Sequence, residues 1–107
     1  MIHVTADSRI YIATQPADFR CGIDGFSALC RKRLEQDPRS GSLFVFINRN
    51  RTMIKVLCYD GSGFWLMTKR LSQGHFKEWP THQTALSHLT AKQFRRLLGG
   101  LSGWQKV

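Results

Sequence analysis

Acidic side chains are scarce in this chain of 107 residues, where seven Asp and Glu stand against sixteen Lys and Arg. A metal-dependent nuclease or transposase centre needs several carboxylates that together hold two divalent ions about 4 Å apart. The few acids here have local explanations instead. Asp60 opens a turn, and Asp24 lies near an expected helix start, where a negative charge favours the helix dipole. The acids therefore argue against a nuclease centre.

Cysteine and histidine patterns that would hold a metal are also missing. Cys21, Cys30 and Cys58 are odd in number and contain no CxxC pair, which argues against a disulfide framework and a zinc ribbon. The four histidines form no HxH or HExxH motif. No P-loop, GxGxxG or GxSxG motif occurs either. We therefore expect no metal, no cofactor and no catalytic residue.

Long apolar runs are absent as well. No stretch approaches the roughly 18 apolar residues needed to span a bilayer, and no charged start followed by an apolar segment resembles a secretion signal. The cysteines fit a reducing compartment. These features predict a soluble cytoplasmic protein with no membrane partner.

Positive charge is what the chain has in excess. The formal net charge is +9 and the isoelectric point lies near 10.2. Such a molecule carries a long-range positive field and favours a polyanionic partner, of which nucleic acid is the most common. A chain of this length can bury one core, so we expect a single domain over residues 1–107.

The apolar spacing predicts two helices. Ile23, Phe26, Cys30 and Leu34 recur at intervals of three and four, which is typical of one apolar face on a helix near residues 23–35. A second helix is expected near residues 91–98. Thr90 and Gln93 form a capping box in front of it.

Alternating and apolar stretches predict the strands. Residues 9–13, 43–48, 53–59 and 64–71 are the expected strands, and residues 76–79 are a candidate short edge strand. The sequence "DGSG" at 60–63 is a strong turn signal between two of them. Residues 80–88 are expected to be loop and residues 101–107 a tail. The predicted fold is α+β, with an antiparallel meander of about four to five strands packed with the two helices.

Hairpin geometry brings four cations together. In an antiparallel meander the end of the third strand lies near the start of the second, so Arg49, Arg51, Lys69 and Arg70 should gather at one end of the sheet. Such a cluster could neutralise several phosphates. The alternative is that these are ordinary solvated charges that discourage edge pairing.

Further basic and aromatic side chains are candidates for the same role. Arg20 and Lys55 are candidate DNA contacts, and the last helix offers a basic surface, although a solvated helix face explains that surface too. The basic residues of this helix are Lys92, Arg95 and Arg96. Aromatic residues around the tight turn, Tyr59, Phe64 and Trp65, could stack on bases. However, "FWLM" at 64–67 is apolar on both faces, which favours a place in the core.

Three collinear stretches carry a family resemblance. They are "TQPADFRCGIDGFSAL", "DPRSGSLFVFINRNRTMIKVLCYDGSGFWLMTKRLSQGHFKEWP" and "LTAKQFRRLLGG". Together they resemble TnpB, the second-reading-frame accessory protein of the insertion-sequence-sixty-six family of bacterial mobile elements, over about residues 9–100. The matching motif positions are Pro16, Asp18, Arg20, Asp24, Gly25, Lys55, Asp60, Gly61, Gly63, Lys69, Arg70, Leu71, Gly74, Trp79 and Pro80. Relatives often carry an aromatic pair where this chain has Cys58 and Tyr59, and the cysteines lie outside the pattern.

The resemblance implies a non-catalytic role in transposition beside a separate transposase that carries the catalytic carboxylates. Two hypotheses follow for the direct partner. The first is mobile-element DNA, bound through the basic surface. The second is docking on the element's transposase, without direct contact with DNA.

Overall fold

Five strands and two helices make up the described part of the chain. A computed structural model describes residues 7–80 and 84–99. In chain order the elements are β1 (Ile10–Ala13), α1 (Ile23–Lys32), β2 (Leu43–Ile47), β3 (Met53–Tyr59), β4 (Phe64–Arg70), β5 (Leu86–Leu89) and α2 (Ala91–Leu98). Neither helix has the length and apolar character needed to cross a bilayer.

The five strands form one sheet in the order β4-β3-β2-β1-β5. The predicted antiparallel meander is confirmed for β2, β3 and β4. β1 pairs with β2 in parallel, and β5 pairs with β1 antiparallel. The parallel pair follows from the position of α1, because a helix between two strands carries the chain back to the starting edge.

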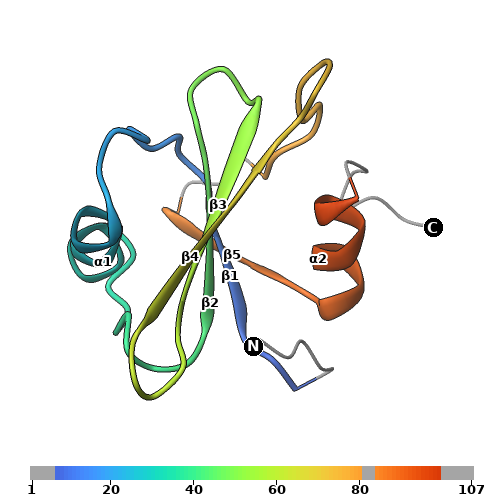
Figure 1. Cartoon of the computed structure of the whole chain (residues 1–107). Coiled ribbons are helices and arrows are strands. Elements are labelled where there is room, and N and C mark those ends of the chain that lie inside the picture. Colours follow the sequence, from blue (N-terminus) through green and yellow to red (C-terminus); the bar gives the residue numbers. More distant parts are fainter. Residues whose placement is uncertain (1–6, 81–83, 100–107) are drawn as a thin grey trace.

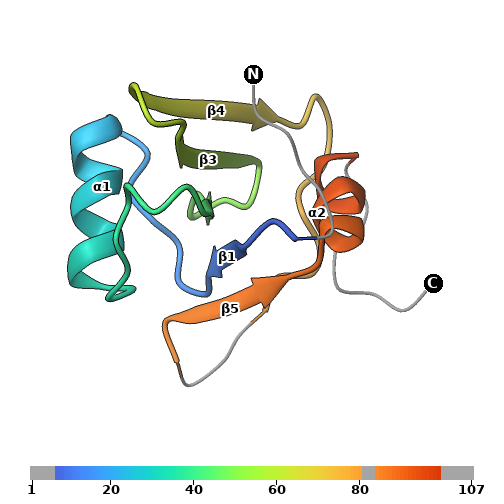
Figure 2. The same cartoon turned by 90° about the horizontal axis from the view of Figure 1, so that it is seen from below.

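The sheet lies between the two helices, with α1 on one face and α2 on the other (Figure 1). Seen from below, the strands fan out between the helices because the sheet is twisted (Figure 2). This three-layer arrangement has a simple cause in β2. All five of its residues are at most 3% exposed, so both faces of the sheet need cover.

Two apolar clusters fill the spaces between the layers. Phe44 and Phe46 of β2 point toward α1, where they meet Phe26 and Cys30. The other β2 residues join the cluster beneath α2, whose own buried residues are Ala91, Phe94 and Leu97. Burial raises the pKa of the Cys30 thiol to about 12, which keeps it protonated and apolar, as the sequence predicts.

The predicted start of the second helix is confirmed. The Thr90 hydroxyl accepts a hydrogen bond from the Gln93 backbone N–H at 3.1 Å, and the Gln93 side chain accepts one from the Thr90 N–H at 2.8 Å. In the 60–63 turn, Gly61 adopts φ +97°, a conformation that residues with a Cβ resist.

Two expectations for the chain after β4 are wrong. Residues 76–79 form no strand. Phe76 and Trp79 are instead buried beneath α2, and the Trp79 Nε1–H donates to the Ala13 carbonyl at 2.8 Å. The loop expected over residues 80–88 contains most of β5, because the edge of β1 supplies a pairing partner that local sequence does not reveal. Residues 81–83 of that loop, and the predicted tail, lie outside the described residues.

Replacing Trp79 with Phe should lower the free energy of unfolding by about 1–3 kcal/mol, because the buried Ala13 carbonyl loses its hydrogen-bond donor. Urea denaturation of the two proteins measures the difference. Trp65→Phe is a matched control, since the Trp65 Nε1–H bonds Asp60 at the surface, where water can replace it. Equal destabilisation of the two variants would contradict a buried role for the Trp79 donor.

Candidate nucleic-acid interface

The turn between β2 and β3 is held rigid by one side chain. The Asn48 Oδ1 accepts hydrogen bonds from the backbone N–H groups of Thr52 and Met53, at 2.9 and 3.1 Å. Its Nδ2 donates to the Thr52 hydroxyl at 3.0 Å. An asparagine that bonds the backbone ahead of it closes a turn in this way. The exposed Arg49 and Asn50 are therefore presented on a fixed loop.

Arg51 and Arg70 lie at the same end of the sheet as this turn. Arg51 has φ +59°, in the left-handed region, and its carbonyl accepts from the Phe76 N–H at 2.7 Å. Arg70 is paired with Met53 across β3 and β4. The β2–β3 turn and the end of β4 thus bring cations to the same end of the sheet, as the hairpin geometry predicts. Within the described residues, no carboxylate lies in salt-bridge distance of Arg49, Arg51 or Arg70.

A second loop brings Arg20 to the same place. The Ala17 N–H donates to the carbonyl of Ile47, the last residue of β2, at 2.9 Å, which fixes residues 17–20 beside the 48–50 turn. Residues 17–20 and 48–50 together line an open, mainly polar cavity of about 450 Å³. Arg20 and Arg49 are the cations on its wall.

Asp18 orients the Arg20 guanidinium. The Arg20 Nε lies 3.1 Å from both Asp18 carboxylate oxygens, and the Nη2 donates to Oδ2 at 2.7 Å. The Arg20 backbone N–H donates to Oδ1 as well. Arg20 stays 91% exposed, so its remaining N–H groups can reach a further anion. The sequence matched Asp18 to a family motif but did not reveal this positioning role.

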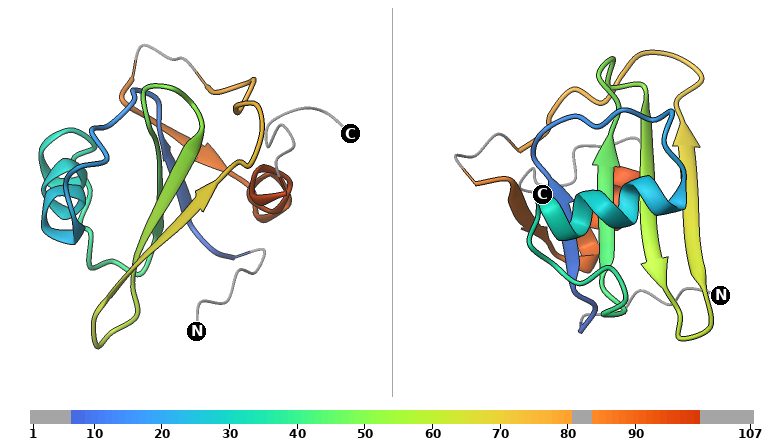
Figure 3. Two further views of the ribbon diagram at one scale, coloured as in Figure 1. Left: turned by 45° about the horizontal axis from the view of Figure 1, so that its top comes forward. Right: turned by 90° about the vertical axis from the view of Figure 1, so that its left-hand side faces the viewer.

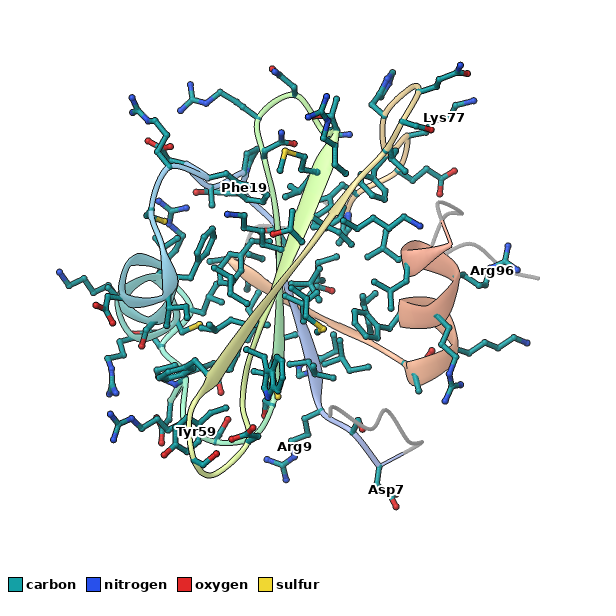
Figure 4. The ribbon with its side chains drawn as sticks, in the orientation of Figure 1. Asp7, Arg9, Phe19, Tyr59, Lys77 and Arg96 are labelled. Carbon is teal, nitrogen blue, oxygen red and sulfur yellow. The ribbon has the colours of Figure 1, made fainter. Side chains whose placement is uncertain are left out.

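Lys55 and Lys69 are used within the fold. The Lys55 Nζ lies over the rings of Phe19 and Phe26, 5.4 and 5.7 Å from their centroids. It is half-buried on the α1 side, where Figure 4 also places Phe19. The Lys69 Nζ donates to the Leu98 carbonyl at the C-terminal end of α2, a position where a cation also complements the helix dipole.

The remaining predicted cations lie on α2. Lys92 and Arg95 are exposed, whereas Arg96 is half-exposed. Arg96 points away from the sheet on the outer side of the helix (Figure 4). The nine predicted residues therefore fall into two surfaces, apart from the two lysines used within the fold. One surface, which we call the sheet-end cluster, contains Arg20, Arg49, Arg51 and Arg70; the other is the outer face of α2.

The aromatic candidates lie at the opposite end of the hairpin from the sheet-end cluster. Tyr59 and Phe64 pack edge to face, with ring centroids 5.0 Å apart, and Figure 4 shows Tyr59 at the bottom of the molecule. Among the described residues, no group of three His, Cys, Asp or Glu side chains could hold a metal ion. The functional groups that the sheet-end cluster offers to a partner are therefore its positively charged guanidiniums.

Asp18 provides a direct test of this geometry. Hydrogen bonds from the Arg20 side chain, then from its backbone, and more weakly the charge of Arg49, hold the pKa of Asp18 at about 2 instead of 3.8. A depressed pKa means that the pair stabilises the fold above pH 3.8 and that this contribution disappears as the pH falls toward 2.

An NMR titration of the Asp18 carboxyl carbon should show a midpoint near pH 2, equal to the pKa of this group. Arg20→Ala should raise the midpoint toward 3.8 without reaching it, because the backbone N–H of residue 20 still donates to the carboxylate, and Arg49→Ala should raise it by less. A wild-type midpoint near 3.8 would contradict the pairing.

Comparison with known proteins agrees with the motifs. Residues 8–107 match the family model described as IS66 Orf2-like protein. The uncharacterized protein y4jC of Sinorhizobium fredii is 39% identical over 107 residues, covering all of this chain and 90% of that protein. The uncharacterized protein y4hO of the same organism is 37% identical over 93 residues, covering 87% of this chain and 80% of that protein. No solved structure matches. The chain belongs to the IS66 Orf2-like family, and membership of it implies an accessory role in transposition.

Proposed function

We propose that this protein is a non-catalytic accessory factor that binds mobile-element DNA through the sheet-end cluster. The observation that carries the proposal is the convergence of Arg49, Arg51 and Arg70 on one end of the sheet with no carboxylate partner there among the described residues. Guanidinium groups bind phosphate oxygens in a two-pronged geometry that an ammonium lacks.

The supporting geometry is an open cavity with an ordered turn and an oriented Arg20 guanidinium on its walls. Asn48 holds the turn that carries Arg49, while Asp18 holds Arg20 on the opposite wall. A site already ordered in the free protein loses less side-chain entropy when it binds a phosphate backbone. The carboxylate of Asp18 weakens the local positive field, but two guanidiniums flank it. The cavity wall therefore keeps a net positive charge.

The proposed contacts are to the DNA backbone. Contacts of this kind set affinity and register without reading base sequence. We therefore expect binding to duplex DNA to be strongly salt-dependent, with sequence preference for element ends supplied by DNA shape or by the transposase. No chemical step is assigned to the protein itself.

A DNA titration at several salt concentrations tests the proposal. The double variant Arg49→Ala/Arg70→Ala should lower the slope of log affinity against log salt by about 0.9 for each phosphate that it no longer neutralises. Fluorescence anisotropy with labelled element-end DNA, random duplex and RNA between about 50 and 200 mM salt measures this slope.

The matched control is Arg31→Ala/Arg33→Ala, which removes the same charge from the exposed end of α1. If the two double variants lose the same affinity for duplex DNA, net charge alone explains the loss, and the assignment of binding to the sheet-end cluster is wrong. Weaker binding only on Lys92→Ala would move the interface to α2. Wild-type protein that binds no duplex at low salt, yet co-purifies with the transposase without DNA, would favour the docking hypothesis.

A further inference from the structure

The strand β4 forms one edge of the sheet that the described residues build. β4 is the last strand in the order β4-β3-β2-β1-β5, and Figure 3 (right) shows it at the outer border of the sheet. Among the described residues, no strand pairs with its outer side. An exposed edge of this kind can template pairing with another strand.

The hairpin register determines which backbone groups face outward. The Asp60 N–H donates to the Gly63 carbonyl, and the Leu71 N–H donates to the Thr52 carbonyl, at the two ends of the hairpin. In an antiparallel ladder the hydrogen-bonded pairs alternate. The odd-numbered residues of β4 therefore bond to β3. The even-numbered residues, from Phe64 to Arg70, direct their N–H and C=O groups to the open edge.

Large apolar side chains flank this edge on the α2 side. Trp65 is 46% exposed and Met67 is 38% exposed, contrary to the core position expected for this stretch. The Trp65 indole is already fixed, because its Nε1–H donates to Asp60 Oδ2 at 2.7 Å. An aromatic anchor held in one position loses little entropy when a partner covers it.

An apolar groove lies next to these side chains. It has a volume of about 250 Å³ and runs between β4 and α2. The residues that line it are Ile54, Val56, Met67, Thr68, Lys69, Phe94 and Leu98. Two of these lining residues are joined by the hydrogen bond from the Lys69 Nζ to the Leu98 carbonyl.

We propose that a second copy of this chain pairs with β4, antiparallel and centred on Met67, to form a dimer with one continuous sheet. In this register Leu66 lies opposite the partner's Thr68, and Phe64 lies opposite the partner's Arg70. Both pairs consist of residues whose backbone groups face the open edge, so the ladder can continue across the dimer. The partner's Trp65 then lies opposite Lys69, at the groove.

Charge favours a second copy in this orientation. β4 is aromatic at its start and cationic at its end, where Lys69 and Arg70 lie. Antiparallel pairing sets each cationic half against the partner's aromatic half, an arrangement that permits cation–π contacts. It also keeps the two cationic halves at opposite ends of the shared strands. A parallel stack would place like charges side by side and is disfavoured.

Salt separates this proposal from DNA binding, on which it does not depend. Each chain carries a net charge of +9, so screening should strengthen the association of two copies. Salt should weaken DNA binding by the same chain. Sedimentation velocity of the full chain without DNA, at about 0.1 and 1 M NaCl, should therefore show a dimer fraction that rises with salt. A monomer at both concentrations of salt would overturn the proposal.

Thr68→Pro tests the edge itself. The Thr68 N–H faces outward, so proline removes a donor from the dimer ladder while the pairing with β3 remains. The variant should be a monomer with the far-ultraviolet circular dichroism of the wild type. Thr68→Ala, which keeps the N–H, should remain a dimer.

A second variant, Met67→Lys, places two ammonium groups together at the symmetry axis and should also dissociate the pair. A dimer that survives both Thr68→Pro and Met67→Lys would exclude β4 as its interface.

A cysteine on the axis tests the register. Residues directly opposite in a non-hydrogen-bonded pair have Cα atoms about 4.5 Å apart, within the range of a disulfide. Met67→Cys in a Cys21→Ser background should therefore give a covalent dimer on a non-reducing gel after oxidation with diamide. Thr68→Cys in the same background should crosslink far less, because it lies opposite the partner's Leu66. Equal crosslinking, or crosslinking at position 68 alone, would overturn the register.

Discussion

Burial of β2 on both faces is the constraint on which the architecture depends. A strand with five apolar residues and no polar face cannot lie on the surface of a two-layer protein. It needs two neighbouring strands and a helix above and below, and the chain supplies them with α1 and α2. With both faces of β2 covered in this way, the basic side chains of the predicted site lie at the sheet ends, on the edge strand and on the outer face of α2, except for Lys55 of β3, which lies over aromatic rings. The sheet-end cluster is one outcome of that arrangement.

Local patterns predicted most elements of the fold. The run at residues 43–47, the alternation after Met53 and the capping box at Thr90 each point to one structure, and each is found at nearly the expected bounds. β5 was not predicted because "LSHL" is short and half polar, and only the exposed edge of β1 makes it a strand. Residues 76–79 have the apolar content of a strand. Their aromatic side chains, however, bury themselves under α2 and leave the backbone in a loop.

The candidate site was predictable in its topology but not in its side-chain directions. Hairpin geometry correctly brought the β2–β3 turn to the end of β4. Adjacent strand residues point to opposite faces, so Lys69 turns toward α2 while Arg70 points to the α1 side. The partnership of Asp18 with Arg20 and the aromatic setting of Lys55 depend on loops meeting in space. The spacing of residues in the sequence does not predict these contacts between loops and strands.

The Asn48 turn also has a consequence for time scales. Its three side-chain hydrogen bonds hold the loop that carries Arg49 in a defined conformation in the free protein. The proposed contact with DNA would then need no slow conformational step in this loop, and long-range attraction between charges would govern the rate of encounter. The same rigidity limits how far the loop can adapt to different shapes. Under the proposed binding mode, the DNA backbone and not the loop would therefore supply the deformation that a close fit requires.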